Sequence, residues 1–139
     1  MDNFQSAAET MVKAMEKHAR ALGVKGVILV ASMDDAGSSW VSHMKAVDMM
    51  KKIPEHPEKE AYPGYNFVGI AYSKAAEMAD TKLDSGGGVR PAYQGEFGYQ
   101  GGAIKKIKSG YILTVFSGAT GEQDFEIATV GMKAFESIR

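Results

Sequence analysis

The chain has 139 residues, which fits one domain over residues 1–139 with one hydrophobic core. Apolar residues make up 45% and the net charge is −1, so the composition gives no general attraction to nucleic acid or to an anionic membrane. The absence of cysteine excludes disulfides, thiolate metal sites and cysteine nucleophiles. No apolar run approaches the roughly 20 residues that span a bilayer, and the N-terminus does not have the pattern of a secretory signal. We therefore expect a cytoplasmic protein.

An amphipathic helix is predicted over residues 3–22, with Gly23 as its left-handed C-terminal cap. His18 falls inside the apolar face of this helix, one turn from Met15 and Leu22. A histidine in that position needs a partner for its ring nitrogens. Two interpretations stay open, a structural role and a role as a ligand to a metal or to haem iron.

A β-hairpin is predicted next. Residues 24–33 hold an apolar run short enough for a core strand, residues 34–37 have turn chemistry, and residues 38–44 alternate, with His43 and Val41 on one face. Residues 46–53 suggest a short helix, and the charged, proline-containing stretch that follows indicates a surface loop in which His56 is solvated.

A second long helix is predicted over residues 65–83, and a glycine-rich segment with aromatic residues, 85–102, follows it. No Gly-Lys-Ser/Thr sequence accompanies these glycines and no strand immediately precedes them, which excludes a phosphate-binding P-loop. Glycines at this density either let the backbone pass close to a flat ligand or a neighbouring subunit, or form a mobile loop. Arg90, the one cation in the segment, is a candidate partner for a carboxylate.

Residues 102–107 and 111–116 predict a second hairpin, and a third helix follows the turn at residues 117–119. Thr120 and Gln123 predict a capping box at the start of this helix. Asp124 projects into the apolar arc of its first turn, where it either caps the helix or faces a ligand. The order helix, two strands, helix, two strands, helix predicts an α+β fold with a central antiparallel sheet.

The segment 117–124, Ser-Gly-Ala-Thr-Gly-Glu-Gln-Asp, with the Ile-Ala that follows at 127–128, resembles the C-terminal signature of the GlcG/HbpS-like haem-binding proteins. Weaker matches lie at Lys74-Ala75-Ala76, Asp35-Ala36-Gly37, Gly101-Gly102-Ala103-Ile104 and Ser109-Gly110. The chain departs from the family pattern in lacking the proline of its Gly-Gly-x-Pro-Ile segment and an arginine after the first hairpin. Residues 113–116 are bulkier than in the family, and residues 48–64 resemble an insertion.

The resemblance implies a profilin-like α/β sandwich that forms a homo-oligomer and binds haem or another tetrapyrrole, with haem sequestration or breakdown as the activity. Haem iron needs an axial donor such as histidine or tyrosine, an apolar slot, and cations for the propionates. We predict His18 as the axial ligand, with His43 as the alternative. Arg90 and the amide-rich start of the last helix (Thr120, Gly121 and Asp124) are predicted to bind the rest of the cofactor.

Two other functions are considered. The same scaffold suits a non-catalytic sensor of a small metabolite, or an oligomeric assembly module, because a fold does not determine a function. A hydrolase or transferase that uses Asp124 and a histidine is disfavoured, since the chain has no nucleophile elbow and no histidine pair at metal-binding spacing. The sequence leaves open whether the protein is an enzyme.

Overall fold

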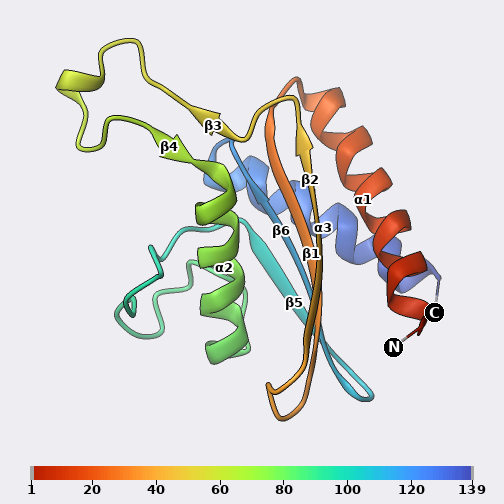
Figure 1. Ribbon diagram of the computed structural model, residues 1–139. Helices are drawn as coiled ribbons and strands as arrows, with labels where there is room; N and C mark the ends of the chain where they lie inside the picture. The colour runs from red at the N-terminus through yellow and green to blue at the C-terminus, as the bar shows by residue number, and fades with distance from the viewer. Residues whose placement is uncertain (1, 139) are drawn as a thin grey trace.

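The computed structural model describes residues 2–138, and it has three layers (Figure 1). A four-stranded antiparallel sheet lies in the middle in the order β2-β1-β6-β5. Its strands are β1 (Gly26–Asp34), β2 (Trp40–Val47), β5 (Gly102–Ile107) and β6 (Gly110–Ser117). One face is covered by α1 (Asp2–Leu22) and α3 (Gly121–Ser137), and the other face by α2 (Phe67–Thr81).

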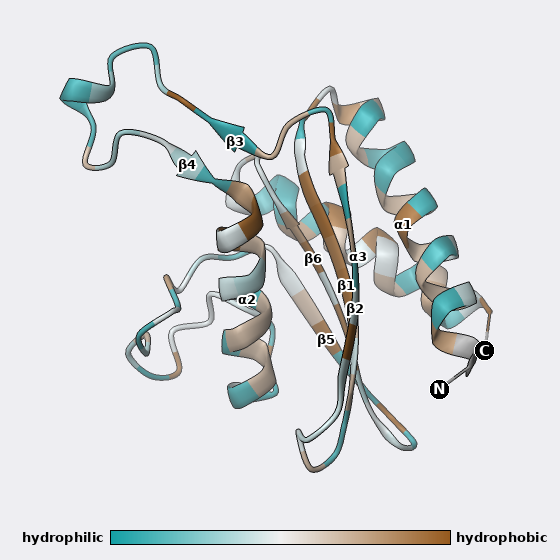
Figure 2. Ribbon diagram, viewed as in Figure 1, coloured by the Kyte–Doolittle hydropathy of each residue, from teal (hydrophilic) through white to brown (hydrophobic). Residues whose placement is uncertain are grey.

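The central strand β1 is apolar on both faces because helices cover both sides of it (Figure 2). Successive side chains of a strand point to opposite faces. Accordingly, Ile28 and Val30 pack in the core under α1 and α3, whereas Leu29 and Ala31 pack in the core under α2. The predicted order of main helices and strands, and the α+β class, are confirmed.

Residues 46–53 do not form the short helix that the sequence suggested. Ala46 and Val47 continue β2 and pair with Val27 and Gly26, so the prediction is wrong at this point. The next residues form β3 (Lys51–Lys52), which pairs with β4 (Tyr65–Asn66) in a separate two-stranded sheet. Pairing with neighbouring strands satisfies the backbone here and overrides local helix propensity.

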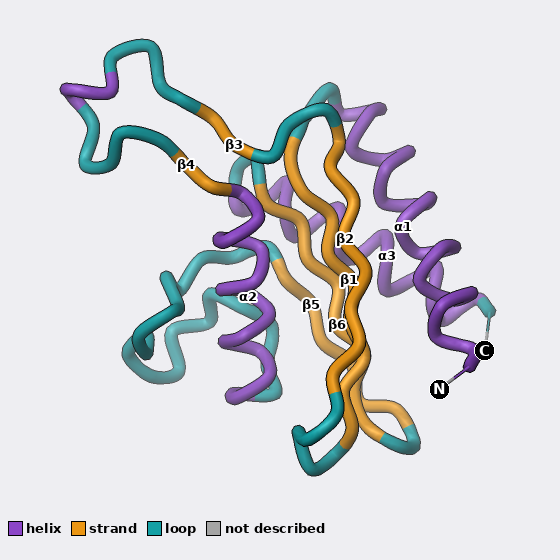
Figure 3. The backbone as a smooth tube through the Cα atoms, in the orientation of Figure 1, coloured by secondary structure: helices purple, strands orange, loops and turns teal. Residues whose placement is uncertain are grey.

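The connection between β3 and β4 projects away from the main sheet as a hairpin-like arm, with a short 3₁₀ helix (Pro57–Lys59) near its end (Figure 3). Asn66 then caps α2, because its side chain accepts the N–H groups of Val68 and Gly69. No helix in the described part of the chain is long and apolar enough to cross a membrane.

Helices α1 and α3 approach closely at Gly131. A Cβ atom at this position would lie 2.8 Å from Cγ of Met15 and 3.2 Å from Cγ2 of Thr114. The missing side chain therefore lets α3 pack against both α1 and the sheet.

We expect Gly131→Leu to lower the free energy of unfolding by about 1–3 kcal/mol, because the added side chain overpacks this contact. Urea unfolding measures the change. Lys133→Leu, at an exposed position two residues further along α3, is the control and should change the stability by no more than about 0.5 kcal/mol. Equal stabilities of the two variants would contradict the close packing.

Candidate functional site

A lysine and an aspartate are paired in the interior, where α2, β6 and α3 meet. Nζ of Lys74 lies 2.9 Å from Oδ2 of Asp124 and donates to the carbonyl oxygen of Phe116 at 2.7 Å. Oδ1 of Asp124 accepts the N–H of Ala119 at 2.9 Å. Lys74 is only 2% exposed and Asp124 only 4%. The pair therefore ties α2 to the start of α3 across the end of β6.

The backbone at Gly101 passes directly over this ion pair. A Cβ atom there would collide with Nζ of Lys74 and would lie 2.7 Å from Cβ of Asp124. The residue also has φ of +132°, in a region that side chains rarely allow. Position 101 therefore needs glycine for two reasons, the missing side chain and the backbone angle.

Burial acts against both charges of the pair. It raises the pKa of Asp124, while the charge of Lys74 and the N–H groups of Ala119 and Gly118 act in the opposite direction. Burial also lowers the pKa of Lys74, and here Asp124 opposes the change. The charge of each partner thus offsets part of the cost of burying the other.

A polar pocket of about 290 Å³ lies beside the pair. Its wall combines the two charged side chains, the turn before α3 and three aromatic rings: Lys74, Asp124, Ser117, Gly118, Ala119, Gly121, Gln100, Ile70, Tyr65, Phe67 and Tyr99. Asp124 is thus buried, as a structural cap would be, and also lies at a cavity, as a ligand-facing residue would. Both interpretations of Asp124 remain compatible with the structure.

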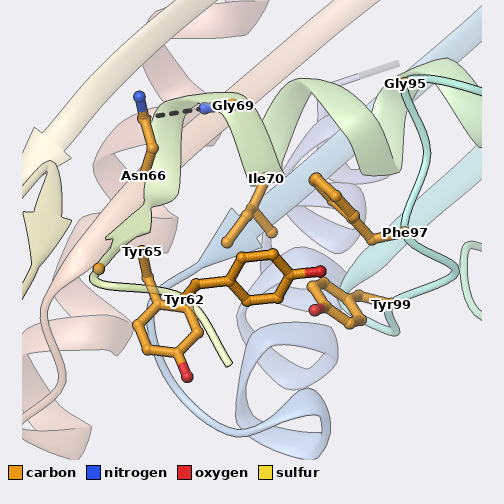
Figure 4. A pocket seen from close by; sticks show the side chains of 9 residues that line it. Tyr62, Tyr65, Asn66, Gly69, Ile70, Gly95, Phe97 and Tyr99 are labelled. Atoms are coloured by element: carbon orange, nitrogen blue, oxygen red, sulfur yellow. Dashed lines mark hydrogen bonds between the residues drawn. The ribbon is translucent and has the colours of Figure 1, made fainter. Parts of the chain in front are cut away.

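An aromatic slot, also of about 290 Å³, adjoins the polar pocket and shares Tyr65, Ile70 and Tyr99 with it. The slot lies between the N-terminal half of α2, the β3–β4 arm and the glycine-rich segment (Figure 4). Its wall consists of Tyr62, Gly64, Tyr65, Asn66, Gly69, Ile70, Gly95, Phe97 and Tyr99. The rings of Phe97 and Tyr99 are stacked, with centroids 5.5 Å apart and planes 24° apart.

Arg90 holds the glycine-rich segment in shape. Its guanidinium binds both oxygens of Glu96, at 2.8 and 3.0 Å, and Oδ2 of Asp80 at 2.7 Å. It also lies 3.5 Å from the centre of the Tyr93 ring. The hydrogen bonds that Arg90 donates to Glu96 raise the pKa of its guanidinium. Arg90 does bind carboxylates, as the sequence suggested, but they are carboxylates of its own chain.

The structure brings together only some of the predicted site residues. Thr120 forms the predicted capping box with Gln123, and Gly121 and Asp124 of the same turn reach the polar pocket. His18 lies between α1 and α3, with Nε2 2.5 Å from Oε2 of Glu126. His43 lies on β2 with its ring 5.8 Å from that of Phe4. Neither histidine lines the slot or the polar pocket.

Lys74 was not among the residues predicted for the site, although the sequence contained a signal for it. It lies three residues after Ala71 and four before Met78. This helical spacing places Lys74 on the same face of α2 as those two apolar residues, the face that is expected to be buried. A lysine on a buried helix face requires a charged partner. The sequence could have flagged Lys74 on this ground, but it could not have identified Asp124, 50 residues away, as that partner.

No protein-family model matches the sequence, and no curated protein is similar to it. Solved structures do match. The fold is similar to that of the Klebsiella pneumoniae protein ORFY of family DUF336, with a TM-score of 0.65 and 18% identity over 96% of this chain and 90% of that one. It is also similar to the PduOC:heme complex, with a TM-score of 0.63 and 16% identity over 93% and 91% of the two chains. At this identity the likeness establishes the fold.

We expect Lys74→Met to lower the free energy of unfolding by about 3–5 kcal/mol, because it leaves the Asp124 carboxylate buried without its partner. The double variant Lys74→Met/Asp124→Leu should lose much less than the sum of the two single changes, and urea unfolding of all four proteins measures this coupling. The half-exposed pair of Lys106 and Asp35, 2.8 Å apart, is the control, with an expected coupling below about 1 kcal/mol. Equal coupling in the two pairs would contradict the interior placement.

We also expect the penalty of Lys74→Met to depend on pH. A carboxyl group with a raised pKa in the folded state stabilises the fold below its unfolded pKa of about 3.9, and that contribution is lost as the pH rises through the folded pKa. Without Lys74 the pKa of Asp124 rises further, so the loss of stability relative to the original protein should be larger at pH 7 than at pH 4. The variant Lys74→Met/Asp124→Asn, which has no titrating group there, should not show this difference.

Proposed function

We propose that the protein binds a flat, largely apolar ligand of the tetrapyrrole class in the aromatic slot, with the polar end of the ligand in the adjoining polar pocket. The observation that carries this proposal is the slot itself, where four aromatic rings and Ile70 surround a cavity that opens onto a charged, amide-lined end. The two cavities together lie within the range of about 300–1,000 Å³ that is common for small-molecule sites. The fold shared with a protein solved in complex with heme supports the choice of ligand class.

The wall of the slot fits the ring of a tetrapyrrole better than it fits histidine ligation of iron. The rings of Phe97 and Tyr99 offer stacking surfaces, but the described residues of the two cavities include no histidine or methionine. Tyrosine is also an axial ligand of haem iron. Burial raises the pKa of Tyr65, and its hydroxyl donates to Glu60, so Tyr99, which borders both cavities, is the better candidate donor.

The polar end of the ligand would meet the start of α3. The first N–H groups of a helix lack partners inside the helix and favour negative charge. Gly121 lies there, in the wall of the polar pocket. Arg90 is already bound to Glu96 and Asp80, and we therefore assign the propionates to the start of α3 and not to Arg90.

A leucine at position 69 tests the slot directly. A Cβ atom on Gly69 would meet no atom closer than 3.8 Å, so Gly69→Leu should fold and extend into the slot. We expect it to weaken hemin binding by about tenfold or more, as followed by the Soret band during titration at micromolar protein. Ala76→Leu, exposed on the same helix, is the matched control and should bind as the original protein does. If both variants bound hemin with equal affinity, the slot would not be the binding site.

Variants of the predicted iron ligands belong in the same titration. If haem binds in the slot, His18→Ala and His43→Ala keep the Soret shift and Tyr99→Phe alters the spectrum. The assignment of His18 as axial ligand stays a prediction, and loss of the shift in His18→Ala would place haem on the surface between α1 and α3. Adding a reductant in air distinguishes sequestration from breakdown, because verdohaem or biliverdin bands appear only if dioxygen has oxidised a meso carbon of the haem ring.

A second candidate function is a metabolite sensor that binds an iron-free flat ligand in the same slot. The lack of histidine among the described residues of the slot favours it. Metal-free protoporphyrin discriminates between the two, since a sensor of this kind would bind it as tightly as hemin. The homo-oligomer that the resemblance implies also stays a prediction. Sedimentation of the purified protein tests it, and a monomer at all concentrations would reject it.

A further inference from the structure

Glu77, in the middle of α2, is a buried carboxylate with only one of its oxygens satisfied. The residue is 7% exposed. Oε2 accepts the N–H of Gly86 at 2.9 Å, whereas Oε1 is shielded from solvent and has no hydrogen-bond partner in the described part of the chain. Leaving a buried charged oxygen unpaired is costly, so folded proteins normally satisfy such an atom with a donor, a water or an ion.

A cavity of about 20 Å³ lies beside Glu77. Thr81 of α2 and the loop backbone at Gly88 and Gly98 form other parts of its wall. This volume holds one water-sized particle. Glu77 thus both carries the unpaired oxygen and lines the cavity, which are two separate observations on one residue.

The charges around the cavity are not balanced. Arg90 and Glu96 also contribute to its wall, but the guanidinium is taken by both oxygens of Glu96 and by Asp80. The guanidinium of Arg90 thus binds the carboxylates of Asp80 and Glu96. Glu77 has no cationic partner among the described residues, because its printed contact is the N–H of Gly86.

We propose that this cavity holds one dehydrated hard cation, with Oε1 of Glu77 as its charged ligand and neutral oxygens as the others. No group of three or more histidine, aspartate or glutamate side chains among residues 2–138 is placed to hold a metal, which argues against a transition metal. One carboxylate with hydroxyl and backbone carbonyl oxygens is a ligand set for an alkali ion or Ca²⁺. Mg²⁺ retains several waters and would not fit a cavity of this size.

The ion would order one wall of the aromatic slot. Glu77 already holds Gly86 at one end of the glycine-rich segment, and the cavity contacts Gly88 and Gly98 further along it. The same segment carries Gly95, Phe97 and Tyr99 of the slot. Occupancy of the cavity therefore couples α2 to the loop that would contact a ligand.

The test uses the full chain, dialysed against chelator and a choline buffer. Thermal unfolding is measured with CaCl₂, NaCl or KCl, and with choline chloride at the same ionic strength. At a saturating concentration one of these cations should raise the Tm by about 3 °C or more and slow amide hydrogen exchange over residues 86–100. Isothermal titration with that cation should give one site per chain.

Glu77→Gln decides whether the carboxylate is the ligand, and the exposed Glu9→Gln is its control. We expect Glu77→Gln to lose the cation-dependent rise in Tm and Glu9→Gln to keep it. Two results would overturn the proposal. One is no cation-specific change in the original protein, which means that the cavity takes a water only. The other is the same change in Glu77→Gln, which means that the cation binds elsewhere.

Discussion

The ion pair between Lys74 and Asp124 is the constraint on which the candidate site depends. A buried ion pair contributes little net stability, because both charges lose their hydration. Removing one partner is nevertheless strongly unfavourable, so the pair restricts how the chain can pack. It requires α2 and the start of α3 to meet at the end of β6, and it requires Gly101 to pass over them. The polar pocket lies at this junction.

The aromatic slot is built mostly from segments outside the four-stranded sheet. Tyr62 and Tyr65 come from the β3–β4 arm and its connection, and Phe97 and Tyr99 come from the glycine-rich segment. The solved structures with the same fold are 18% and 16% identical to this chain. Loops vary more than the elements that they connect, and function is often located on them. At this identity the likeness concerns the fold alone, and it determines neither the site nor its ligand.

The charged side chains Arg90 and Glu96 of the glycine-rich segment form ion pairs within the chain. Arg90 is bound by Glu96 and Asp80, and its charge is therefore compensated within the fold. His18 is similar, since the carboxylate of Glu126 in α3 accepts a hydrogen bond from its ring N–H. In each case a residue whose type suggested a ligand contact has a partner in its own chain. Residue type alone cannot distinguish these two situations, because an isolated sequence does not show which charges meet.

Local patterns in the sequence determined the order of the main helices and strands and the capping box of Thr120 and Gln123, because each of these depends on residues a few positions apart. The two hairpins of the central sheet are local as well, but the pairing of β1 with β6 that joins them brings together residues as distant as Val27 and Ser117. The β3–β4 pairing, the Lys74–Asp124 ion pair and the aromatic slot depend on contacts between residues far apart in the chain. Asp124 illustrates the difference between local and long-range information. Neighbouring residues predict its position in the first turn of a helix. Its pairing with Lys74 depends on the tertiary structure, because a charge that packing removes from water needs an opposite charge beside it.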